Sequence, residues 1–89
     1  MVKFNKKIIN KLGLHARASA KLTQLCSNYQ SEIWILYNKK KINAKSIMGV
    51  MMLAASNGSN LSFEVKGSDE ELAKQNIETL IENKFDEKE

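Results

Sequence analysis

The sequence is poor in several residue types, and each shortage excludes a class of protein. It has one cysteine, Cys26, no proline and four glycines among 89 residues. A single cysteine cannot form an internal disulfide or a cysteine-rich zinc site, and it is typical of a reducing compartment. No apolar run reaches the roughly 18 residues of a membrane span, and residues 1–9 lack the apolar stretch of a signal peptide. We therefore expect a cytoplasmic protein without membrane insertion.

The residues that are present have an ordinary globular composition with an uneven distribution of charge. With 43% hydrophobic and 27% charged residues, residues 1–89 are expected to form one domain. Residues 1–45 hold ten Lys or Arg against one acid, a net charge of +9, whereas residues 46–89 hold four Lys against nine acids, a net charge of −5. This asymmetry indicates either an acidic macromolecular partner, nucleic acid or protein, or two halves that attract each other in the fold.

Apolar periodicity predicts the element order β-α-β-β-α-β-α. Alternation predicts strands over residues 2–9, 31–37, 41–44 and 60–66. Helical spacing predicts helices over residues 16–28, over a short segment after Ser46, and from 69 to about 84. Ser68 and Glu71 have the spacing of a capping box for the third helix, and residues 83–89 are expected to be a frayed acidic tail.

This order favours an α+β fold, an open-faced two-layer sandwich. A helical crossover makes the first two strands parallel, and the fourth strand fits between them as a split βαβ unit. We therefore expect a four-stranded antiparallel sheet of order 1-4-2-3 with three helices on one face. Ile33 and Ile35 should then point into the core, and Trp34 and Leu36 should lie on the open face.

His15, the only histidine, is the strongest candidate for chemistry. It directly precedes the first predicted helix, where free backbone N–H groups and the helix dipole favour an anion. A neutral imidazole nitrogen can attack phosphorus, and the phosphate oxygens would then lie against the N–H groups of Ala16 and Arg17 and the Arg17 guanidinium. No metal ligands, general-base carboxylate or nucleotide-binding loop accompany this histidine. From the residues alone, His15 is either an ordinary surface histidine or the acceptor in a phosphoryl carrier, which would not be an enzyme and would need no cofactor or metal.

Two motifs carry a resemblance to a known family. Residues 13–17, GLHAR, resemble the active-site segment of the HPr family, the phosphocarriers of the bacterial phosphotransferase system, and residues 43–51, NAKSIMGVM, resemble its regulatory motif. The resemblance implies that enzyme I phosphorylates Nδ1 of His15, that Arg17 stabilises the phosphoryl group, and that the group passes to an enzyme IIA. Ala18 departs from the proline usual in the family, which should slightly loosen the start of the helix.

Ser46 is expected to have a structural role and a regulatory role. A serine at this position is a good N-cap for the second helix. The resemblance implies that an ATP-dependent HPr kinase/phosphorylase phosphorylates it, which would weaken docking by repulsion. Lys45 is a candidate counter-charge.

A docking surface for partners is expected beside His15. The second helix is more apolar than two turns require, and exposed Met side chains suit a surface that binds successive partners. The predicted surface comprises Ile47, Met48, Met51, Met52, Ala20, Lys21, Gln24 and Lys45.

Two other functions compete with this interpretation. Lys39–Lys41 and the exposed Trp34 suggest a nucleic-acid module, but paired stacking aromatics and a GXXG loop are missing, so we expect no nucleic acid. A regulatory-only carrier of the nitrogen-related phosphotransferase branch would use the same His15, and the sequence does not distinguish it. We expect a monomer in either case.

Overall fold

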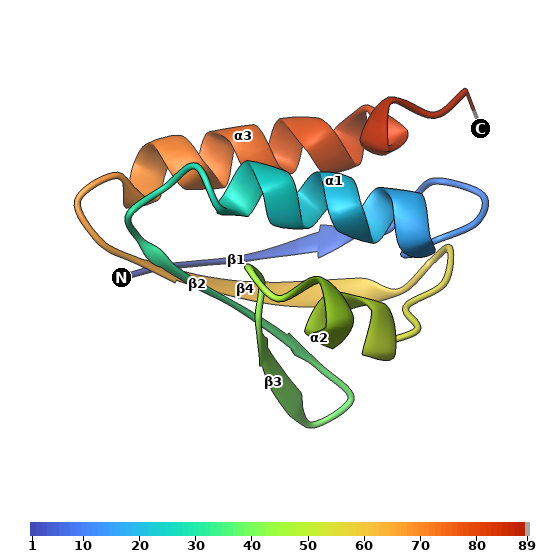
Figure 1. Cartoon of the computed structure of the whole chain (residues 1–89), viewed down its shortest axis with the longest axis horizontal. Coiled ribbons are helices and arrows are strands. Elements are labelled where there is room, and N and C mark those ends of the chain that lie inside the picture. The colour runs from blue at the N-terminus through green and yellow to red at the C-terminus, as the bar shows by residue number, and fades with distance from the viewer. Residues whose placement is uncertain (89) are drawn as a thin grey trace.

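The computed structural model describes residues 1–88 and has one four-stranded sheet with helices packed against it (Figure 1). The strands are β1 (Val2–Lys7), β2 (Glu32–Tyr37), β3 (Lys40–Asn43) and β4 (Asn60–Lys66). Paired strands are antiparallel, in the order β1-β4-β2-β3. The predicted strand order and the open α+β sandwich are confirmed.

Three helices accompany the sheet: α1 (Ala16–Cys26), α2 (Ile47–Met52) and α3 (Glu70–Glu82). α1 and α3 lie side by side across one face, and α2 packs against α1 near the β2–β3 hairpin (Figure 1). α1 ends two residues earlier than predicted, because the N–H groups of Asn28 and Tyr29 donate to carbonyls only three residues back. These tight turns lead the chain out of the helix and into β2.

Side-chain alternation determines which face of the sheet is the core. In β4, Leu61, Phe63 and Val65 are fully buried, while the residues between them face the other side. In the neighbouring β2, Ile33 and Ile35 are buried, as predicted.

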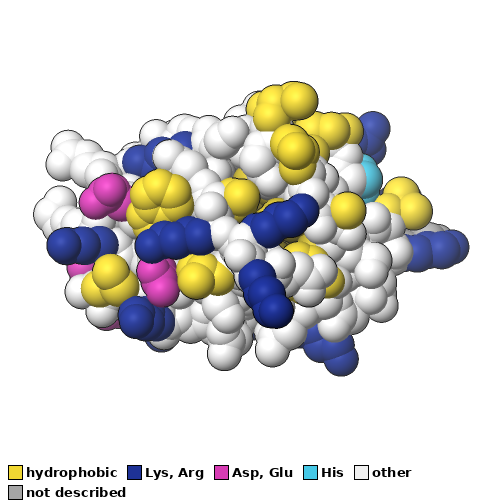
Figure 2. Space-filling view, turned by 90° about the horizontal axis from the view of Figure 1, so that it is seen from below, with side chains coloured by type: hydrophobic (Ala, Val, Ile, Leu, Met, Phe, Trp, Pro, Cys, Tyr) yellow, Lys and Arg dark blue, Asp and Glu magenta, His cyan; other side chains and the backbone are white. Residues whose placement is uncertain are grey.

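The opposite face of the sheet is not covered by α1 or α3, and Figure 2 shows that Lys and Arg outnumber Asp and Glu on it. Trp34 and Leu36 are half-buried there, and the Lys41 ammonium lies 5.2 Å from the centroid of the Trp34 ring. Lys41 also pairs with Glu64 at 3.5 Å.

The start of α3 differs from the prediction. The cap residue is Asp69 and not Ser68, and the Asp69 side chain makes no capping bond. Its carboxylate instead accepts hydrogen bonds from the backbone N–H groups of Gln30 and Ser31, at 2.9 and 3.0 Å, and from the Ser31 hydroxyl at 2.5 Å. Glu70 accepts the N–H of Gly67 at 3.1 Å. The predicted Ser68–Glu71 capping box is wrong, because the Asp69 carboxylate bonds to the loop before β2 and the Glu70 carboxylate bonds to the backbone directly after β4.

The C-terminal segment also differs from the expected frayed tail over residues 83–89. Lys84–Asp86 form a short turn, η1, and the Phe85 side chain is fully buried in the core. The Lys21 ammonium donates to the Phe85 carbonyl at 2.9 Å. η1 therefore packs against α1, the side chains of Asn83 and Lys88 are exposed, and Glu89 lies outside the described residues.

Candidate functional site

His15 occupies the N-cap of α1, as the sequence predicted. Its Nδ1 accepts a hydrogen bond from the backbone N–H of Arg17 at 3.3 Å. The ring is half-buried, and the Ala16 and Arg17 side chains beside it are exposed. One ring nitrogen therefore faces the amide groups at the start of the helix, where an anion is favoured.

The segment before His15 fixes its position. Gly13 has φ +66, and a Cβ at this residue would lie 2.5 Å from the Ala55 carbonyl oxygen. Leu14 is buried, and its N–H donates to the same carbonyl at 2.8 Å. The Ser19 hydroxyl donates to the Leu14 carbonyl at 3.1 Å. Only glycine allows the backbone to pass this close, so the sequence places His15 directly after a conformationally restricted turn.

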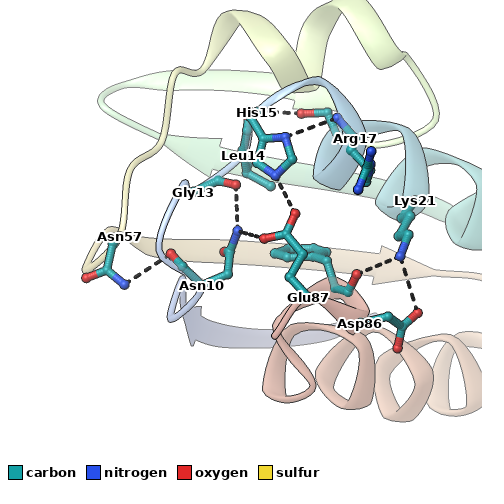
Figure 3. A network of polar contacts seen from close by, with 11 residues as sticks. Asn10, Gly13, Leu14, His15, Arg17, Lys21, Asn57, Asp86 and Glu87 are labelled. Carbon is teal, nitrogen blue, oxygen red and sulfur yellow. Dashed lines mark hydrogen bonds and ion pairs between the residues drawn. The ribbon is translucent and has the colours of Figure 1, made fainter. Parts of the chain in front are cut away.

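The C-terminal segment completes the site (Figure 3). Glu87 contacts Nε2 of His15 through Oε2, and its Oε1 accepts a hydrogen bond from Nδ2 of Asn10 at 2.9 Å. Asn10 is fully buried, and its Nδ2 also donates to the Gly13 carbonyl at 2.8 Å. The imidazole is therefore contacted from two sides, by the Arg17 N–H and by Glu87, and Asn10 holds the Glu87 carboxylate in place.

A pocket of about 700 Å³ opens beside the imidazole. Its lining includes four cationic side chains, Lys11, Arg17, Lys21 and Lys88, and two acidic ones, Asp86 and Glu87. The excess of positive charge next to a helix N-terminus favours an oxyanion such as a phosphoryl group.

Two titratable groups near α1 have shifted pKa values. Burial raises the pKa of Glu87, but hydrogen bonds from Asn10 and His15 and nearby positive charge, including that of Arg17, outweigh burial, so the net pKa lies below the usual glutamate value. Burial raises the pKa of the Cys26 thiol and outweighs the charge of Lys45, which lowers it, so the net pKa is about 12. Cys26 is therefore a buried core thiol, and Glu87 is an ionised acceptor at neutral pH.

Ser46 is the N-cap of α2, as predicted, and its hydroxyl accepts the N–H of Gly49 at 3.2 Å. With Ser46 unmodified, the Lys45 ammonium donates to the Tyr29 carbonyl at 2.7 Å, and its role as a counter-charge to a phosphorylated Ser46 stays a prediction. Tyr29 is half-buried and lies after the end of α1. A hydrogen bond from a charged donor satisfies its carbonyl group there.

The predicted docking residues on α2 are exposed. Met48 and Met52 are 65% and 69% exposed, and Ile47 and Met51 are also on the surface. Figure 2 shows apolar side chains gathered on the molecular face close to the single histidine. On α1, Gln24 is exposed, whereas Ala20 and Lys21 are half-buried.

Sequence reasoning missed Asn10 and Glu87. Asn10 lies in a polar loop and carries no motif, and Glu87 sits in a run of charges that is typical of a solvated tail. The one available signal was Phe85, because an aromatic residue between Lys84 and Asp86 indicates that the tail packs somewhere.

Neither a metal centre nor a membrane helix is found in the described residues. Within residues 1–88, no group of three or more His, Cys, Asp or Glu is arranged to hold a metal ion. No helix in the same range is long and apolar enough to cross a bilayer.

Comparison with known proteins gives concordant matches. A family model described as the PTS HPr component phosphorylation site matches residues 2–83. Phosphocarrier protein HPr of Cupriavidus necator is 56% identical over 80 residues, 90% of each chain. The crystal structure of HPr-C-His from Thermoanaerobacter tengcongensis superposes with a TM-score of 0.95 over the whole of both chains, at 44% identity. Phosphocarrier protein NPr of Shewanella violacea is 44% identical over 80 residues, 90% of this chain and 88% of that one.

These matches span the site and the sheet alike, and they agree with the two sequence motifs and with a histidine at the N-terminus of α1. The chain therefore belongs to the HPr family, the phosphocarrier proteins of the phosphotransferase system.

Proposed function

We propose that His15 accepts a phosphoryl group on Nδ1 from phosphorylated enzyme I and passes it to an enzyme IIA. The observation that supports this most strongly is the contact between Nδ1 and the Arg17 N–H at the start of α1. A nitrogen that accepts a hydrogen bond is unprotonated and carries a lone pair. When that lone pair attacks phosphorus, the Arg17 N–H leaves Nδ1 and can donate to an incoming phosphate oxygen.

The surrounding groups can stabilise the product without further chemistry. Phosphoryl transfer asks a protein mainly for alignment and charge stabilisation. The Ala16 and Arg17 N–H groups and the exposed Arg17 guanidinium supply both. In this proposal the protein is a carrier, and the donor and acceptor proteins provide the remaining groups.

The partners would dock on the surface formed by α2 and the exposed side of α1. Exposed methionines adapt to partners of different shape, and an apolar patch of this kind usually marks an interface. Met48→Ser and Met52→Ser should therefore weaken binding of enzyme I. Leu72→Ser is the matched control, because Leu72 is 53% exposed on α3 instead.

Ser46 would adjust this docking when an HPr kinase/phosphorylase modifies it. A phosphate adds about −1.5 to −2 of charge at the first turn of α2, next to the apolar docking residues. Repulsion from an acidic partner would then weaken association. The cytoplasmic location expected from the sequence belongs to the same proposal, because protein-to-protein transfer needs all partners in one compartment.

A regulatory-only role is the second candidate, and similarity to the NPr of Shewanella violacea favours it. Both branches use a phosphohistidine, so they differ in which enzyme IIA accepts the group. Comparing transfer rates from the phosphorylated protein to a sugar-specific and to a nitrogen-related IIA distinguishes them.

Intact mass spectrometry tests the central proposal. The protein, phosphoenolpyruvate and purified enzyme I should yield one acid-labile phosphoryl adduct. His15→Ala should abolish the adduct, and Ser46→Ala should retain it. If the wild type gains no mass while a known HPr does so in a parallel reaction, the proposal fails.

A further inference from the structure

The two ring nitrogens of His15 each have a protein contact (Figure 3). Nδ1 accepts the Arg17 N–H at 3.3 Å, and Nε2 faces Oε2 of Glu87. A neutral imidazole carries one N–H and one lone pair, whereas an ionised carboxylate can only accept. Both contacts are satisfied together only when the ring is neutral and its proton is on Nε2.

The Glu87 carboxylate is held in place by more than its contact with the ring. Its Oε1 accepts the hydrogen bond from buried Asn10 at 2.9 Å, so each oxygen has its own donor. These hydrogen bonds favour the ionised carboxylate, which agrees with the lowered pKa of Glu87.

The backbone before Glu87 adopts an unusual conformation. Lys84, Phe85 and Asp86 have φ values of 56, 55 and 64, in the left-handed region, which costs about 1–2 kcal/mol per non-glycine residue. Burial of the Phe85 ring and the bond from Lys21 to the Phe85 carbonyl hold this turn together. The turn directs the chain back toward α1 and places Glu87 beside His15. Backbone strain of this kind is common at functional sites.

We propose that Glu87 is a positioning residue for His15 that fixes the ring in its Nε2–H tautomer and leaves Nδ1 as the nucleophile. This inference deepens the proposed function and rests on transfer to Nδ1. The Nδ1 lone pair forms the new N–P bond as the P–N bond of the phosphohistidyl donor breaks, and that electron pair stays on the donor nitrogen. The proton remains on Nε2, and the Glu87 carboxylate balances the positive charge that develops on the ring.

Nitrogen-15 NMR of the unphosphorylated protein tests the tautomer directly, independently of any partner. At a pH where the ring is neutral, the wild type should show a protonated Nε2 and an unprotonated Nδ1, with the Nε2–H protected from exchange with water. Glu87→Ala should lose that protection and shift both nitrogen signals toward a tautomer mixture. Asp86→Asn is the matched control, because it removes the same charge from the same turn and asparagine tolerates a positive φ.

Phosphorylation kinetics with phosphoenolpyruvate and enzyme I test the consequence. Glu87→Ala should still take up one phosphoryl group on His15, but about 10-fold more slowly, by analogy with the lower end of effects seen when a metal-ligating histidine loses its orienting partner. Glu87→Gln keeps an acceptor for Nε2–H, so it should preserve the wild-type ring signals while losing part of the rate.

The outcomes separate the two proposals. Unchanged ring signals or an unchanged rate in Glu87→Ala overturns the role of Glu87, as does an equal effect in Asp86→Asn. Failure of the wild type to become phosphorylated overturns the proposed function, and the NMR result still decides whether Glu87 fixes the tautomer.

Discussion

The ammonium of Lys21, in the middle of α1, donates a hydrogen bond to the carbonyl of Phe85, 64 positions later in the chain, at 2.9 Å. The Phe85 ring beneath it is fully buried. The contact fastens the end of the chain to the helix that carries His15 at its N-cap. The C-terminal segment is therefore part of both the core and the site.

Phe85→Ala should strongly destabilise the fold. Removing a buried phenylalanine side chain loses its transfer free energy and leaves a cavity, with a typical cost of about 3–5 kcal/mol. Urea unfolding should show this as a lower midpoint. Leu72→Ala, at an exposed position of α3, should change stability by no more than about 0.5 kcal/mol. A similar small change for Phe85→Ala would contradict the burial of the ring.

Gly13→Ala should destabilise the protein and disturb His15. An alanine at φ +66 costs about 1–2 kcal/mol, and its Cβ would also collide with the Ala55 carbonyl oxygen at 2.5 Å. Gly58→Ala is a matched control, because Gly58 has φ +91 but no atom within 4 Å of the added Cβ. Thermal unfolding should show a larger loss at Gly13, and the His15 ring signals in NMR should move only in that variant. An equal loss of stability in the two variants would show that the contact with the Ala55 carbonyl oxygen adds nothing to the cost at Gly13.

The sequence predicted the sheet and the position of His15 because both depend on local patterns. Leu61, Phe63 and Val65 alternate cleanly, and His15 stands between a glycine turn and an amphipathic helix. The pairing of His15 with Glu87 depends on tertiary packing of a charged tail, which has no periodicity. The bond from Lys45 to the Tyr29 carbonyl likewise depends on which backbone groups the folded chain brings within reach of its long side chain.

The hairpin between β2 and β3 is expected to gain stability from glycine. Asn38 and Lys39 have φ values of 50 and 65, as in a type I′ turn, where glycine is favoured at the second position. Lys39→Gly relieves the left-handed strain but raises the entropy of the unfolded chain, which leaves a net gain of about 0.5–1 kcal/mol. Lys39→Ala removes the same charge but keeps the strain of a positive φ, so the urea midpoint of its unfolding should not rise. A gain in both variants would point to charge instead of backbone strain.

Asp69 should make stability depend on pH in the acid range. The hydrogen bond from the Ser31 hydroxyl, together with backbone N–H bonds, holds the pKa of Asp69 below its usual 3.8. A carboxylate with a lowered pKa in the folded state adds stability above its unfolded pKa, and this is lost as pH falls through the folded value. Asp69→Asn should therefore lower the melting temperature at neutral pH, and the difference should shrink below about pH 4. Glu71→Gln, on the exposed side of the same helix start, serves as the control. A difference for Asp69→Asn that is constant with pH would contradict the assignment.

Ser46 should contribute to stability as an N-cap, separately from any modification. Its hydroxyl accepts the Gly49 N–H at 3.2 Å, and replacing a capping serine with alanine costs about 1 kcal/mol. Ser46→Asp keeps an acceptor at the N-cap and adds negative charge at the positive end of α2, so it should retain most of the wild-type stability. Enzyme I binding measured by calorimetry should show the opposite order, with Ser46→Ala close to the wild type and Ser46→Asp weaker. If Ser46→Asp loses stability and binding together, the loss of binding would come from a disrupted helix and not from repulsion.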